Sequence, residues 1–211
     1  MIDIDNIRIC YGGQEVIRRF SLSANPREKI VLSGPSGSGK SSILRALLGL
    51  VIPDEGTISI GSCAIDNRTV WPLRTKMGYV AQEPDMGEGT VRDVVDRCFS
   101  FKANHTLKDN LNRLNDMLTR FYLSEAILDK DLSALSGGEK QRVALVIALL
   151  LDREILLLDE VSSALDRKCT EAVADYLQTS PQTVLLVTHD DRLMRIADRV
   201  VEIGSSQEEA N

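Results

Sequence analysis

The chain has 211 residues, of which 43% are hydrophobic and 27% charged, and its formal net charge is −6. This composition is that of an ordinary globular protein and excludes an intrinsically disordered chain. The acidic balance argues against a nucleic-acid binder that works by bulk electrostatics, because such domains are usually basic. No stretch approaches the roughly 18 apolar residues of a membrane span, and the N-terminus lacks the pattern of a secretory signal. We therefore expect neither membrane insertion nor secretion.

The first third of the chain is predicted to consist mainly of strands. Isoleucines roughly alternate with polar residues over 2–9, as in a half-buried strand. A short apolar run over 29–33 ends in a glycine-rich turn, and a helical pattern over 43–50 follows it. Further strands are predicted over 57–60 and 76–81.

The middle of the chain has a helical pattern, and the last third alternates strands with helices. Apolar residues spaced by three or four form one helical face, predicted to be an ordinary packing face: Leu107, Leu111, Leu114, Leu118 and Phe121. Continuous apolar runs over 155–158 and 183–187 are typical of parallel strands buried on both sides, and helices are predicted over 139–151 and 168–177. The sequence therefore predicts an α/β core interrupted by a helical insert over about 84–150, with a loose polar tail over 205–211.

A phosphate-binding loop is predicted at residues 34–41, whose sequence GPSGSGKS matches GxxxxGK[ST] between a strand and a helix. Its glycines let consecutive backbone N–H groups surround a phosphate, and the helix that follows adds the partial positive charge of its N-terminus. Lys40 is predicted to neutralise the β- and γ-phosphates, and the Ser41 hydroxyl to bind Mg²⁺. The predicted nucleotide-binding residues of this segment are Gly34, Pro35, Ser36, Gly37, Ser38, Gly39, Lys40, Ser41 and Ser42.

Two neighbouring carboxylates reduce the number of reactions that a phosphate-binding loop alone leaves open. Asp159 and Glu160 end a buried strand, at the sheet edge where ligands collect in open α/β folds. Asp159 is predicted to hold Mg²⁺, and Glu160 to polarise a water for attack on the γ-phosphate. The alternative is that these two acids merely cap the following loop.

A second helix start able to bind phosphate is predicted at Ser136, Gly137 and Gly138, within the sequence LSGGEKQR. These residues would expose the free N–H groups of the helix that follows them. A chain with one nucleotide loop but two such helix starts suggests that each site is completed by another copy of the chain. In isolation the same motif would be plain helix initiation.

With these motifs in this order, the chain resembles the ATP-binding cassette (ABC) ATPases over essentially its whole length. The resemblance implies a single cassette over 1–211, with a P-loop NTPase core, a mainly parallel sheet, an N-terminal antiparallel β subdomain and the helical insert. ATP and Mg²⁺ are the implied ligands. The departures are small: Val161 and Ser162 stand where many members have Pro-Thr, and Ser42 stands where Thr is common.

The resemblance also assigns roles to residues that lie outside these three motifs. Tyr11 matches the aromatic residue that stacks on adenine, although it could simply be an edge-strand aromatic. Gln82 matches the glutamine that senses Mg²⁺ and the γ-phosphate, although it could be a solvated strand end. His189 matches the switch histidine at the γ-phosphate, although a lone histidine is more often structural.

A further set of matches implies a dimer. Ser136 and Gly138 match the signature that reaches the γ-phosphate of the partner copy, and 163–166 matches the loop that crosses the dimer. Asp166, the last residue of that loop, could also be a helix cap, and the two interpretations are compatible.

These matches predict an ATP-hydrolysing subunit of an ABC transporter, which closes as a head-to-tail homodimer and drives a separate membrane permease. We expect it at the cytoplasmic face of the membrane, held there by the permease, with no nucleic-acid partner. A weaker similarity to bacterial iron-export ATPases suggests metal export. The alternatives are a soluble ABC ATPase of translation or DNA repair and, in another class, a P-loop kinase acting on a small substrate.

Overall fold

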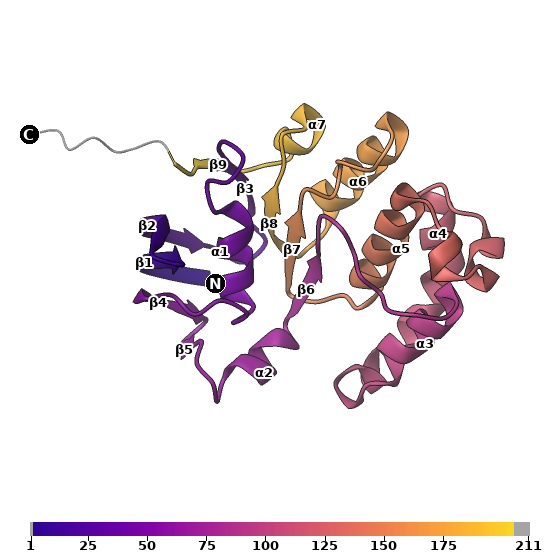
Figure 1. Ribbon diagram of the computed structural model, residues 1–211. Coiled ribbons are helices and arrows are strands. Elements are labelled where there is room, and N and C mark those ends of the chain that lie inside the picture. Colours follow the sequence, from indigo (N-terminus) through magenta and orange to yellow (C-terminus); the bar gives the residue numbers. More distant parts are fainter. Residues whose placement is uncertain (1, 205–211) are drawn as a thin grey trace, which may run out of the picture.

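The computed structural model describes residues 2–204, and Figure 1 shows how its elements are arranged. The strands are β1 (Ile2–Tyr11), β2 (Gln14–Ala24), β3 (Lys29–Ser33), β4 (Glu55–Ile60), β5 (Cys63–Ala64), β6 (Met77–Val80), β7 (Ile155–Asp159), β8 (Thr183–Val187) and β9 (Arg199–Glu202). The α-helices are α1 (Lys40–Leu47), α2 (Val70–Arg74), α3 (Val91–Ser100), α4 (Leu114–Arg120), α5 (Gly137–Leu150), α6 (Arg167–Thr179) and α7 (Asp191–Met194). Three 3₁₀ helices are η1 (Lys102–Arg113), η2 (Glu125–Asp129) and η3 (Leu132–Ala134). The tail predicted over 205–211 lies outside the described residues, and none of the helices described is long and apolar enough to cross a membrane.

A five-stranded parallel sheet in the order β6-β7-β8-β3-β9 forms the centre of the molecule. Successive residues of its strands are buried on opposite sides. Leu156 packs into a core shared with helices α3 to α6, and Leu157 into a second core shared with α1 and the N-terminal strands. Burial on both sides is why β7 and β8 have continuous apolar sequences, and it confirms the prediction of parallel strands.

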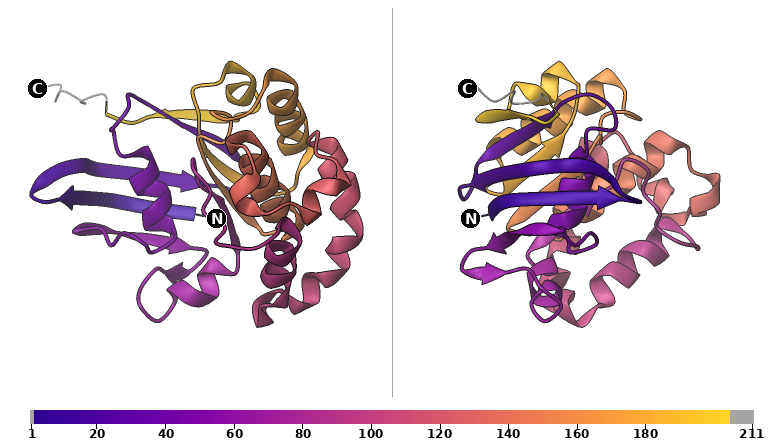
Figure 2. Two further views of the ribbon diagram at one scale, coloured as in Figure 1. Left: turned by 45° about the vertical axis from the view of Figure 1, so that its right-hand side comes forward. Right: turned by 60° about the vertical axis from the view of Figure 1, so that its left-hand side comes forward.

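A second, antiparallel sheet has the order β2-β1-β4-β5, and its long β1–β2 hairpin extends away from the helices that lie between β6 and β7 (Figure 2). Strand β1 buries Ile2, Ile4, Ile7 and Ile9. Asn6 adopts a left-handed φ of 46°, and the pairing with β2 shifts register between Ile4 and Ile7. This irregularity explains why the apolar spacing widens from two to three in the middle of the strand.

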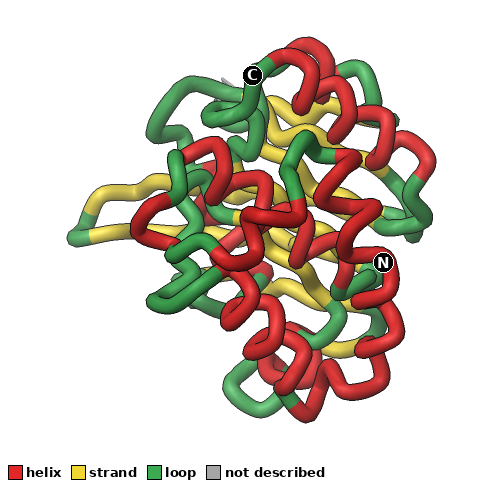
Figure 3. The backbone as a smooth tube through the Cα atoms, turned by 90° about the vertical axis from the view of Figure 1, so that its right-hand side faces the viewer, coloured by secondary structure: helices red, strands yellow, loops and turns green. Residues whose placement is uncertain are grey.

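The helices between β6 and β7 gather on one side of the parallel sheet, where they face the viewer in Figure 3. The apolar face predicted over 107–121 is divided between η1 and α4 instead of lying on one α-helix. Leu118 and Phe121 are fully buried, whereas the leucines of η1 are half-buried. Asparagine side chains in η1 bond backbone carbonyls elsewhere, Asn104 to Cys98 at 2.6 Å and Asn110 to Leu150 at 2.8 Å. Polar side chains of this type commonly replace regular helical hydrogen bonding.

Both sheets and the helical section occur as expected from the sequence, which confirms the predicted α/β architecture. Whether residues 84–150 act as a distinct helical subdomain of one cassette over 1–211 stays a prediction.

Candidate functional site

Four of the parallel strands bring the predicted site residues to one edge of the sheet. The register pairs Leu32 with Val187, Val187 with Asp159, and Leu158 with Val80, so β3, β8, β7 and β6 end side by side. The phosphate loop follows β3, and the segments carrying His189, Glu160 and Gln82 follow β8, β7 and β6. Residues far apart in the sequence therefore share the edge at which ligands bind in open α/β sheets.

Two glycines of the phosphate loop cannot be replaced without displacing their neighbours. Gly34 has a φ of 143°, and a Cβ there would collide with the carbonyl oxygen of Ile203, the residue after β9. Gly39 has a φ of 91°, and a Cβ there would lie 2.5 Å from Ile17 Cδ1 of β2. The loop is thus packed between the two sheets in a backbone conformation that favours glycine.

The loop holds two buried polar groups suited to a phosphate. Lys40 is 5% exposed, and its Nζ donates to the carbonyl oxygens of Gly34 at 2.8 Å and Pro35 at 2.7 Å. Ser38 Oγ is buried and has no hydrogen-bond partner among residues 2–204. A buried hydroxyl without a partner costs about 1–3 kcal/mol, which a phosphate oxygen bound there would offset. These residues therefore fit a nucleotide phosphate.

Ser41 and Asp159 meet directly across the sheet edge. The Ser41 hydroxyl donates to Asp159 Oδ1 at 2.9 Å, and the Tyr79 hydroxyl of β6 donates to Oδ2 at 3.4 Å. Asp159 is 2% exposed, and burial raises the pKa of its carboxyl, while the Ser41 hydrogen bond acts in the opposite direction. A hydroxyl beside a carboxylate is the oxygen donor set that Mg²⁺ prefers, so these residues also fit the predicted cation.

Glu160, the residue after Asp159, has a strained backbone conformation. Its φ is 47°, a left-handed value that is uncommon outside glycine. Its N–H donates to the Val187 carbonyl at 2.9 Å, and its carbonyl accepts from Ser163 N at 3.0 Å. Strain of this kind persists where the surrounding structure holds it, often at functional sites. The half-buried Glu160 is therefore fixed at the edge beside Asp159.

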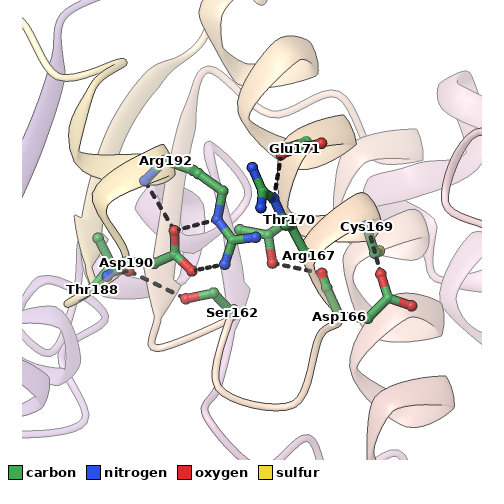
Figure 4. Close-up of polar contacts among 9 residues, drawn as sticks. All are labelled: Ser162, Asp166, Arg167, Cys169, Thr170, Glu171, Thr188, Asp190 and Arg192. Atoms are coloured by element: carbon green, nitrogen blue, oxygen red, sulfur yellow. Dashed lines mark hydrogen bonds and ion pairs between the residues drawn. The ribbon is translucent and has the colours of Figure 1, made fainter.

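His189 is exposed, and the residues on either side of it, Thr188 and Asp190, take part in the hydrogen bonds drawn in Figure 4. Thr188 Oγ1 lies 3.2 Å from Ser162 Oγ and accepts from Asp190 N at 3.0 Å. Asp190 in turn pairs with Arg192 in the first turn of α7. These contacts attach the segment that carries His189 to the loop after Glu160. Gln82, beyond the end of β6, is exposed as well.

Tyr11 lies beside the phosphate loop although it belongs to the antiparallel sheet. Its hydroxyl donates to Ser42 Oγ at 3.3 Å, and its side chain is 45% exposed. The position is consistent with a ring surface next to the nucleotide loop, and its role in stacking stays a prediction.

The residues of the LSGGEKQR motif begin α5, in the helical section. Ser136 is the N-cap and forms a capping box with Glu139, in which Ser136 N donates to Glu139 Oε2 at 2.9 Å. Ser136 and Gly137 are exposed, and a Cβ at Gly138 would lie 2.7 Å from the Ala164 carbonyl oxygen. The motif therefore contacts the loop before α6. It caps α5, which packs in the core on one side of the parallel sheet, whereas Lys40 begins α1, which packs in the core on the other side.

Asp166 is the N-cap of α6, and its side chain accepts from Cys169 N at 2.8 Å. The helix-cap alternative is thus correct for this chain. A capping role does not conflict with the predicted place of 163–166 at a dimer interface.

Two further residues, Tyr79 and Gln141, contact the site although no sequence pattern predicted them there. Tyr79 is in an otherwise apolar strand, and only the pairing of β6 with β7 brings it to Asp159. Gln141 Nε2 donates to the Ala81 carbonyl at 3.1 Å, next to Gln82. Gln141 belongs to the LSGGEKQR motif, which was the available signal, but its partner could be found only in the structure.

A glycine-rich loop at the end of a parallel strand, a buried lysine and a Ser–Asp pair define a P-loop nucleotide-binding protein. The family model described as ABC transporter matches residues 17–163, and the chain belongs to this family. The energy-coupling factor transporter ATP-binding protein EcfA1 of Bacillus licheniformis is 35% identical over 194 residues, 89% of this chain and 68% of the relative. The probable iron export ATP-binding protein FetA of Escherichia coli is 31% identical over 207 residues, covering 96% and 91%.

Among solved structures, a dimeric ATP-binding cassette in a post-hydrolysis state with ADP and Pi matches with a TM-score of 0.83. It is 27% identical, and the match covers 96% of this chain and 94% of that one. The chain is thus an ABC ATPase and an ATP-binding subunit of a transporter.

Proposed function

We propose that two copies of this chain close head to tail around two ATP molecules and that hydrolysis reopens them. The separation of Lys40 from Ser136 carries the proposal. Lys40 begins α1, which packs on one side of the parallel sheet, whereas Ser136 caps α5, which packs on the other side. A second copy would bring its own Ser136 and Gly138 to the nucleotide, as the dimeric form of the matching cassette supports. ATP that bridges two copies only in the closed state shifts the population toward closure.

Within each site the residues divide the chemistry. Lys40, Ser38 and the loop N–H groups would bind the phosphates, and Tyr11 would cover the adenine. Ser41 and Asp159, with Gln82, would hold Mg²⁺, which neutralises charge on the β- and γ-phosphates when bound. Glu160 would accept a proton from water as the water oxygen attacks the γ-phosphorus. The bond between the γ-phosphorus and the oxygen that bridges it to the β-phosphate would break, and its electron pair would leave with ADP. His189 would contact the γ-phosphate and stabilise its charge.

A permease would dock on the helical section, close to Gln82. A cavity of about 560 Å³ lies there between the segment that follows Gln82 and the residues before α5. It is lined by Pro84, Asp85, Met86, Gly87, Glu88, Gly89, Asp131, Leu132, Ser133 and Lys140. The segment from Gln82 to the cavity is continuous, so a change at the nucleotide would reach a partner seated in the cavity. Such a partner would hold the chain at the cytoplasmic face of a membrane.

The relatives share the transporter role but differ in the cargo that their names give. FetA is named for iron export, which supports the metal-export prediction, whereas EcfA1 is named for an energy-coupling factor transporter. The cassette role proposed here is common to both.

Mixing two inactive variants tests the shared site. Lys40→Ala should abolish nucleotide binding, and Ser136→Arg should block the surface offered to the partner. In a mixed dimer one site combines the intact Lys40 of one copy with the intact Ser136 of the other. Random mixing should therefore restore about a quarter of the wild-type ATPase rate. Absence of any recovery, with both variants folded, would contradict the shared site.

Co-purification of the wild-type chain with an integral membrane protein tests the transporter partner.

A further inference from the structure

Gln141 is a buried glutamine whose amide nitrogen is hydrogen-bonded but whose amide oxygen has no partner among residues 2–204. It lies in α5, one turn after Ser136, and is 1% exposed. Its Nε2 donates to the carbonyl of Ala81, the residue before Gln82. Its Oε1 is buried and has no partner among the described residues 2–204. This amide therefore attaches the helix of the LSGGEKQR motif to the segment that carries Gln82.

We propose that Gln141 is a positioning residue that couples movement of the start of α5 to Gln82. The proposal rests on the role of Gln82 at the nucleotide proposed above. When the second copy engages Ser136 and Gly138, α5 would carry the Ala81 carbonyl, and with it Gln82, into place at the γ-phosphate. In that state Oε1 would accept an N–H group of the segment beginning at Gln82.

Helix α5 is buried at its C-terminal end, whereas its N-cap is exposed. Helix α5 extends from the exposed Ser136 to Leu150 and lies directly against β6, where a Cβ at Gly78 would be 3.6 Å from the Ala148 carbonyl oxygen. This contact holds the C-terminal half of α5 against the sheet, whereas Ser136 at its other end is exposed. Strand β6 ends at Val80, and among residues 2–204 no backbone–backbone hydrogen bond is made by residues 81–88, so side-chain contacts hold this segment. The Gln141 amide is such a contact, and it is located immediately before Gln82.

The unpaired oxygen leaves Gln141 with an acceptor that a second position of the Gln82 segment could use. A buried amide oxygen without a partner lowers the free energy of unfolding, and methionine would fill a similar volume without that cost. A residue that exchanges between two hydrogen-bonded states needs both the donor and the acceptor of the amide.

Gln182 provides a matched control within the same chain. It is 4% exposed, its Nε2 donates to the Arg153 carbonyl at 3.1 Å, and its Oε1 is also unpaired in the described residues. It precedes β8, at the end of the sheet opposite His189. The two glutamines therefore share burial and bonding but differ in their relation to the nucleotide edge.

The test compares Gln141→Met, Gln82→Ala, the double variant and Gln182→Met for kcat, KM for MgATP and thermal unfolding. Gln141→Met should lower kcat about tenfold while KM stays within about twofold and the unfolding temperature does not fall. In the Gln82→Ala background the same substitution should have no further effect, because it acts through Gln82. Gln182→Met should keep the wild-type kcat.

Several outcomes would overturn the proposal. These are a wild-type kcat for Gln141→Met, a multiplicative loss in the double variant, or an equal loss for Gln182→Met. If Gln82→Ala alone keeps the wild-type kcat, the proposed role of Gln82 fails and the coupling fails with it. If Gln82→Ala is impaired and the losses multiply, only the coupling fails. If neither Gln141→Met nor Gln141→Leu folds, the residue is structural and the proposal is wrong.

Discussion

The hydroxyl oxygens of Ser162 and Thr188 lie 3.2 Å apart and join the loop after β7 to the loop after β8 (Figure 4). Each hydroxyl is close in sequence to a residue with a proposed catalytic role. Ser162 follows Glu160 by two residues, and Thr188 precedes His189 by one. The pair therefore sets the position of the proposed base relative to the proposed γ-phosphate contact.

We expect Ser162→Ala to lower kcat by roughly 3- to 30-fold with little change in KM, because positioning losses act mainly on the transition state. Ser162→Thr keeps the hydroxyl and should retain at least half of the wild-type kcat. Steady-state ATPase assays on the two variants make the comparison. Equal rates for Ser162→Ala and the wild type would show that the hydroxyl pair does not position His189.

Glu160→Gln tests the proposed base while leaving the nucleotide loop intact. The amide cannot accept a proton from water, so hydrolysis should fall by about 10²–10⁴-fold, whereas ATP should still bind. Bound ATP that is not hydrolysed should then accumulate dimers, detectable by gel filtration with and without ATP.

Glu154→Gln is the matched control for that substitution. Glu154 precedes β7, at the end of the strand opposite Glu160, and its exposed side chain lies 3.9 Å from Lys76. We expect this variant to hydrolyse ATP at the wild-type rate and to show no ATP-dependent dimer. A fully active Glu160→Gln enzyme would exclude Glu160 as the base.

Much of this arrangement could be predicted from the sequence, because the strongest patterns are local. The GPSGSGKS loop, the acidic end of β7 and the apolar runs of β7 and β8 each depend on a few consecutive residues. Strand β2 was not predicted as an element, since only Ile17, Leu22 and Ala24 of its eleven residues are buried. The short elements β5, β9 and α2 have too few residues to establish a periodicity.

The side-chain contacts of the site required the structure. The bond between Tyr79 and Asp159 spans 80 positions of sequence, and that between Gln141 and Ala81 spans 60. Such contacts depend on the order β6-β7-β8 and on how α5 packs against β6, neither of which leaves a pattern in consecutive residues. The roles matched by family resemblance could be assigned from sequence, but their local partners could not.

The buried Asp159 carboxylate predicts a conflict between stability and activity. Burial raises its pKa, so the folded chain holds the proton to a higher pH than the unfolded chain does. The contribution of this group to the free energy of unfolding therefore falls as the pH rises from the unfolded pKa through the folded one. Asp159→Asn removes the buried charge and keeps an acceptor for Ser41.

We expect Asp159→Asn to unfold at a higher temperature than the wild type at pH 7, with the difference shrinking as the pH is lowered. Its Mg²⁺-dependent ATPase rate should fall by about 100-fold or more, because a neutral amide binds Mg²⁺ poorly. Differential scanning calorimetry over a pH series and ATPase assays test the two expectations. A lower unfolding temperature at pH 7 would refute the stability argument, and a retained Mg²⁺-dependent rate would refute the metal role.

The Glu139 carboxylate at the start of α5 predicts a stability change of the opposite sign. It accepts from Lys130 Nζ and Ser136 N, each at 2.9 Å, and these bonds lower its pKa from 4.5 to about 2. Its stabilising contribution is therefore complete above the unfolded pKa and is lost as the pH falls from about 4.5 toward 2.

Glu139→Gln keeps an acceptor for Ser136 but loses the ion pair and the titration. In urea unfolding over this range, the wild type should lose more free energy of unfolding than Glu139→Gln. Glu171→Gln, which removes an exposed ion pair with Arg167 on α6, should follow the wild-type curve. Parallel curves for the wild type and Glu139→Gln would mean that the carboxylate does not stabilise the start of α5.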